Sequence, residues 1–78
     1  MNLTTFYKGG SSKGEPGFRF NFEYDAKFVE RFKLVIPHTH REWNPETKTW
    51  WVAQEYEHVL NNMFSNFHAL YHLQGKLF

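Results

Sequence analysis

A change of hydrophobic period between residues 18 and 36 constrains the fold more than any other feature of this sequence. In FRFNFEY, residues 18–24, four aromatic side chains alternate with three polar ones, a pattern typical of a strand with one buried face. After Asp25, which can cap a helix, apolar residues recur at helical spacing until Pro37 disfavours helical geometry at Ile36. The sequence therefore predicts a strand at 18–24 and an amphipathic helix at 26–35.

Two further segments complete the predicted fold. HREWNPETKTWWVA predicts strands at about 39–43 and 49–53, joined by a turn that Asn44 and Pro45 initiate. QEYEHVLNNMFSNFHALYHLQG has helical spacing over four turns and predicts a final helix that ends at Gly75. The prediction is an α+β fold with a small three-stranded sheet, in the order strand, helix, β-hairpin, helix, and with both helices packed on one face.

The N-terminal segment has a different composition from the rest of the chain. KGGSSKGEPG, residues 8–17, has no apolar residue and cannot bury enough surface to offset the entropy of ordering it. LTTFY before it is either a short edge strand or a mobile end. We therefore predict a flexible N-terminal segment at 1–17 and a single α+β domain at 18–78.

Composition limits the class of protein. The chain has 78 residues and no cysteine, so aromatic residues, 21% of the total, must supply a core that no disulfide assists. No apolar run is long enough to span a bilayer, and MNLTTFYKGG has no secretory-signal pattern, which predicts a soluble, cytoplasmic protein, in the host cell if viral. A net charge of +1 is too small for a protein that coats duplex DNA.

One long segment is similar to a known family. FEYDAKFVERFKLVIPHTHREWNPETKTWWVAQEYEHVL combines an aromatic strand, a Tyr-Asp that opens a short helix, an Ile-Pro that ends it, and the turn WNPETKTW. It resembles the HARP-type module found beside the motor domains of annealing helicases and in phage-encoded helicase-like proteins. The resemblance implies a small accessory domain that helps a DNA-remodelling ATPase recognise branched or single-strand/duplex junction DNA. These residues include no motor domain, so we expect no helicase activity from them.

The three tryptophans divide between the two faces of the predicted sheet. If Pro45 to Lys48 forms the loop, Trp43 faces Trp50 on the core side, and Trp51 projects from the opposite face with Glu42. An exposed Trp51 on a polar face could stack a base or anchor a protein, unless the N-terminal segment covers it. The predicted nucleic-acid site is the face opposite the helices and comprises Arg19, Asn21, Arg41, Lys48 and Trp51.

No catalytic, cofactor or metal site is predicted. The sequence has no phosphate-binding glycine motif, no cysteine nucleophile and no serine in a nucleophile-elbow context. The pairs His38/His40 and His68/His72 have spacings that put each pair on one face, but nothing indicates that the two pairs meet. We expect neither an enzyme nor a small-molecule substrate.

Two functions from different classes, and one further possibility, remain open at this point. The leading one is a non-catalytic, phage- or mobile-element-encoded accessory module that recognises forked or single-stranded DNA, with a helicase or another protein as a further partner. The alternative is a small protein-binding adaptor or viral inhibitor that docks on a host protein through an aromatic surface. Self-association through an exposed strand edge is the third.

Overall fold

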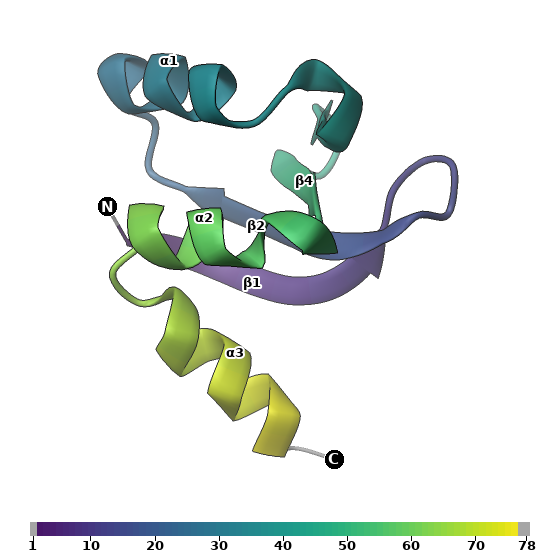
Figure 1. Cartoon of the computed structure of the whole chain (residues 1–78), viewed down its shortest axis with the longest axis vertical. Helices are drawn as coiled ribbons and strands as arrows, with labels where there is room; N and C mark the ends of the chain where they lie inside the picture. Colours follow the sequence, from purple (N-terminus) through teal and green to yellow (C-terminus); the bar gives the residue numbers. More distant parts are fainter. Residues whose placement is uncertain (1, 77–78) are drawn as a thin grey trace.

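The computed structural model describes residues 2–76, with side chains for residues 2–72. Its strands form one antiparallel sheet in the order β1-β2-β4-β3, and the helices pack on one face of that sheet (Figure 1). The strands are β1 (Leu3–Gly10), β2 (Pro16–Phe22), β3 (Arg41–Asn44) and β4 (Thr49–Ala53). The helices are α1 (Ala26–Val35), α2 (Glu57–Met63) and α3 (Phe67–Lys76), with short 3-10 helices η1 (His38–His40) and η2 (Gln54–Tyr56).

The α+β class is confirmed, but the prediction of three strands is wrong because β1 adds a fourth. Leu3 and Phe6 are both buried although they are three residues apart, and a register shift between Leu3 and Thr5 accounts for this. The irregularity breaks the period-two pattern, so the strand is hard to recognise in the sequence. The predicted flexible segment at 1–17 thus contains β1 and the start of β2, joined by a turn in which Ser11 N donates to Glu15 O at 2.8 Å.

Helix α1 and the β3–β4 hairpin confirm the predicted elements. Asp25 caps α1 by accepting a hydrogen bond from Phe28 N at 3.1 Å, as its position before the apolar stripe indicates. In the turn that the sequence predicts at Asn44 and Pro45, Asn44 Oδ1 accepts from Glu46 N at 2.9 Å, which forms an Asx-turn. Strands β2 and β3 are both antiparallel to β4, so they run parallel to each other with β4 between them.

The predicted C-terminal helix is two helices, because the chain breaks between Met63 and Phe67. The Asn66 amide accounts for the break, since it pairs with the backbone of Leu3 in β1. Its Oδ1 accepts from Leu3 N at 2.8 Å, and its Nδ2 donates to Leu3 O at 3.0 Å. After the turn, α3 contacts β1 and runs obliquely to it, whereas α2 precedes it and crosses in front of the sheet in the view of Figure 1.

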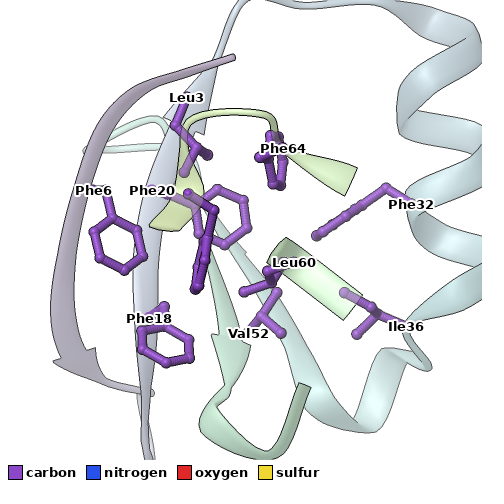
Figure 2. Packing of buried hydrophobic residues seen from close by; sticks show 10 residues of the cluster. Leu3, Phe6, Phe18, Phe20, Phe32, Ile36, Val52, Leu60 and Phe64 are labelled. Atoms are coloured by element: carbon purple, nitrogen blue, oxygen red, sulfur yellow. The ribbon is translucent and has the colours of Figure 1, made fainter. Parts of the chain in front are cut away.

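The core lies between the sheet and the helices and consists mainly of aromatic rings. Phe20 of β2 is fully buried, with the ring centroids of Phe32 from α1 and Phe64 after α2 at 6.1 and 5.4 Å. Figure 2 shows these rings converging with Leu60 and Val52. Aromatic packing therefore supplies most of the buried surface in a chain without disulfides.

Candidate nucleic-acid interface

The strand register determines which side chains share a face. Phe20, Trp50 and Trp43 are partners across three strands and lie on the helix side of the sheet. One residue along, Arg19 pairs with Trp51 and Trp51 pairs with Glu42, which puts these side chains on the opposite side. The predicted division of the tryptophans between the two faces is therefore confirmed.

The predicted exposure of Trp51 is wrong, because this side chain is only 1% exposed. Its indole lies against Gly17 of β2, where an added Cβ would be 2.5 Å from the indole Nε1. The same Nε1 donates to Gly9 O of β1 at 3.0 Å. Gly17 thus leaves room for the ring to lie across β2, and Gly9 of the N-terminal segment supplies its hydrogen-bond partner.

Residues of the β1–β2 hairpin form hydrogen bonds with other side chains of this face. Ser12 donates to the Glu42 carboxylate from both N and Oγ, at 3.0 and 2.9 Å. Arg19 Nε donates to Gly10 O at 3.2 Å, and its Nη1 is buried without a hydrogen-bond partner among the described residues. The face opposite the helices is thus held by the hairpin, and Arg19 and Trp51 are not available there as a stacking and phosphate-binding pair.

A groove of about 610 Å³ opens instead between α1 and the β3–β4 hairpin. Its apolar lining includes Val29 of α1, Tyr24 before that helix, and the indoles of Trp43 and Trp50. Trp43 is 49% exposed and Tyr24 is 77% exposed. The exposed tryptophan of this chain is therefore on the helix side of the sheet.

Trp43 extends the aromatic core to the surface. Its ring centroid is 5.1 Å from that of Trp50, which is in turn 5.0 Å from that of Phe32 in the core. Because Trp50 supports one side of the indole, the exposed part of Trp43 forms a platform that needs little ordering to bind a flat partner.

Three cationic side chains line the same groove: Lys33, Arg41 and Lys48. Arg41 Nε donates to Ile36 O at 2.9 Å, which fixes the guanidinium at the end of α1. Glu42 also borders the groove, but its carboxylate accepts the two hydrogen bonds from Ser12 on the other face. The charge that faces the groove is therefore positive.

The structure divides the predicted site. Arg41 and Lys48 belong to the groove, because Arg41 pairs with Val52 and so lies on the helix side. Asn21 reaches the edge of the groove, but its Oδ1 accepts from Thr5 Oγ1 at 2.8 Å. Arg19 and Trp51 lie apart, on the opposite face.

The sequence prediction missed Lys33, Tyr24 and the exposure of Trp43. Two spacings in the sequence could have indicated that Lys33 and Trp43 belong to one site. Lys33 follows Val29 by four residues, so both share one face of α1, and Arg41 and Trp43 are two residues apart in one strand. Read together, these spacings place a helix cation and a strand cation on the two sides of one indole.

The sequence also singled out histidine pairs as candidate metal ligands. The rings of His68 and His72 are 4.8 Å apart, but the described part of the chain has no cluster of three or more metal-ligating side chains. Among residues 2–76, no helix is long and apolar enough to cross a bilayer.

Comparisons with known proteins found no family model, curated protein or solved structure that matches this chain.

Proposed function

We propose that this protein is a non-catalytic accessory module that binds forked or single-stranded DNA in the groove between α1 and the β3–β4 hairpin. The observation that carries the proposal is the supported, half-exposed indole of Trp43 among three cations. Stacking on an aromatic ring contributes about 1–3 kcal/mol per base, and every unpaired base has a face to stack. Lys33, Arg41 and Lys48 supply contacts to phosphates, which hold the strand without reading its sequence.

The resemblance of roughly residues 18–64 to the HARP-type module supports the same class of ligand. The turn that carries this resemblance, WNPETKTW, contains Trp43 and Lys48 of the groove. A phage or mobile-element origin, and a helicase as the partner that brings the module to DNA, follow from that resemblance as part of the proposal.

The test is a titration with forked, single-stranded and blunt duplex DNA at two salt concentrations, followed by the indole N–H signals in NMR spectra. We expect the Trp43 signal to shift with forked and single-stranded DNA, and the Trp51 signal to stay because its N–H is bonded to Gly9 O. Phosphate contacts release counterions, so the affinity should fall as salt rises. An unchanged Trp43 signal with all three DNAs at low salt would reject the proposal.

One observation favours the alternative, a protein-binding adaptor that uses an aromatic and apolar surface. Leu34 is 82% exposed and Val35 is 44% exposed, both at the end of α1. Exposed apolar side chains next to aromatic ones are typical of protein interfaces. The two functions differ in salt dependence, because an apolar protein contact should change little with ionic strength. A partner whose binding survives high salt and is lost in Leu34→Glu would favour the adaptor.

A further inference from the structure

The groove offers few recognition groups, and this limits what it can hold. One indole, that of Trp43, has a half-exposed face, and three cations surround it. Proteins that follow a long single strand use a groove with several stacking rings and cover about 4–16 nucleotides per domain. The only other well-exposed ring in this groove is that of Tyr24, which lies in the segment between β2 and α1.

The cations flank the indole along the direction of β3. Arg41 and Trp43 are two residues apart on the same side of the strand, so their Cα atoms are separated by about 7 Å. Lys48 lies beyond Trp43, in the turn that follows Asn44. Lys33 lies across the groove on α1. A strand that stacks one base on Trp43 would therefore meet a positive charge on each side of that base.

We propose that the groove takes a single unpaired base together with its flanking phosphates, as presented at a fork or a strand end, and does not follow a long single strand. This inference rests on the proposed function and names the part of the DNA that the site recognises. A base inside a duplex has both faces stacked, so it would have to be unstacked before it could cover Trp43. A terminal or junction nucleotide already has a free face.

Two numerical consequences follow. With at most three phosphate contacts, the slope of log K against log salt should be roughly −2, since each contact to a single strand contributes about −0.7. The affinity should also stop increasing once the oligonucleotide spans the groove. Beyond that length, only the number of equivalent binding positions on the strand rises. For a site of about three nucleotides, this raises the apparent affinity about fivefold between oligonucleotides of four and twelve residues.

The experiment is a length series of thymidine oligonucleotides of two to twelve residues, followed by the Trp43 indole signal of the full chain. The signal is assigned by its loss in Trp43→Phe. We expect the affinity to reach a plateau near three or four nucleotides. A parallel pair of duplexes, one blunt and one with a single unpaired nucleotide at its end, should differ by about 5- to 150-fold in favour of the unpaired end, the contribution of one stacked base.

The outcomes separate this inference from the function on which it rests. If the twelve-residue strand binds more than about 20-fold tighter than the four-residue strand, the groove follows a longer tract. DNA binding would then stand and the single-base inference would fall. If no oligonucleotide shifts the Trp43 signal at low salt, the proposed function fails and the inference fails with it.

A matched pair of variants tests where the phosphates lie. Lys33 and Lys27 are both exposed residues of α1, but only Lys33 lines the groove. Lys33→Gln should reduce the magnitude of the salt slope by about 0.7, whereas Lys27→Gln should leave it unchanged. An equal effect of the two changes would show general charge attraction and would overturn the single-base inference.

Discussion

The two faces of the sheet differ in what covers their tryptophans. On one face the Trp51 indole lies across Gly17, donates to Gly9 O and is 1% exposed. On the other face Trp43 rests on Trp50 beside a groove and is 49% exposed. The face that carries three helices thus keeps the open ring, and the face that carries none buries its ring. The exposure of each indole therefore depends on whether a helix or hairpin extends far enough to cover it, and not only on the face of the sheet to which it belongs.

The largest effect on stability is expected from removing the buried ring of Trp51. Trp51→Ala removes a fully buried ring and its hydrogen bond to Gly9 O, so the free energy of unfolding should fall by about 3–5 kcal/mol. Trp43→Ala, which removes a half-exposed ring, should cost about 1–2 kcal/mol. Urea unfolding followed by far-UV circular dichroism measures both. Similar losses in the two variants would contradict the contrast between the faces.

The glycine beneath the buried indole sharpens the same contrast. In Gly17→Ala the new Cβ would be 2.3 Å from Val52 O and 2.5 Å from Trp51 Nε1, so the strands must move apart. We expect a loss of about 1–3 kcal/mol in the free energy of unfolding, from overpacking.

Gly10→Ala is the matched control for this change, because its Cβ would meet no atom closer than 3.6 Å. Chemical denaturation of the two variants should show a loss for Gly17→Ala only. If Gly17→Ala unfolds with the stability of the parent chain, the indole does not lie over this glycine.

Local patterns in the sequence were sufficient to predict the central elements. The helical spacing after Asp25 predicts α1, and the Asn44-Pro45 pair predicts the turn between β3 and β4. The alternation of Trp50 and Trp51 correctly assigns the two rings to opposite faces. Each of these inferences depends on residues within a few positions of one another.

The features that could not be predicted depend on contacts between distant residues. The bond between Asn66 and Leu3 joins positions 63 residues apart, and the break between α2 and α3 depends on it. The burial of Trp51 depends on Gly9, 42 residues away. Without the fold, the glycines in KGGSSKGEPG indicate only flexibility, whereas Gly17 is the surface on which the indole packs and Gly9 O accepts its hydrogen bond. The sequence prediction therefore left Trp51 exposed, whereas the structure buries it.

A third comparison tests function on the two faces directly. Trp43 and Tyr7 are exposed to a similar extent, 49% and 43%, but Tyr7 pairs with Arg19 and lies on the face opposite the groove. Trp43→Ala should weaken binding of a forked DNA by about 1–3 kcal/mol, the contribution of one stacked base. Tyr7→Ala should leave it unchanged. Fluorescence anisotropy with a labelled fork at low salt measures both, and a stronger effect of Tyr7→Ala would move the site to the other face.

The smallest expected effect has opposite signs for stability and binding. Lys48 has φ of 55°, a left-handed conformation that costs a non-glycine residue about 1–2 kcal/mol. Glycine would relieve this strain but loses about 0.4–1 kcal/mol to the greater freedom of the unfolded chain. Lys48→Gly should therefore raise the free energy of unfolding by up to about 1.5 kcal/mol. It should also reduce the magnitude of the salt slope of DNA binding by about 0.7, since one phosphate contact is lost.

Lys48→Ala separates the two effects, because alanine removes the charge and keeps the strained backbone. Both variants should lose the same affinity for DNA, and only Lys48→Gly should gain stability. Urea unfolding and a salt series of DNA titrations supply the two measurements. Lys48 occupies a backbone conformation that favours glycine. Phosphate binding by its ammonium group beside Trp43 would explain why a lysine stands there. If both variants bind DNA as tightly as the parent chain, Lys48 makes no phosphate contact and the groove loses one of its three cations.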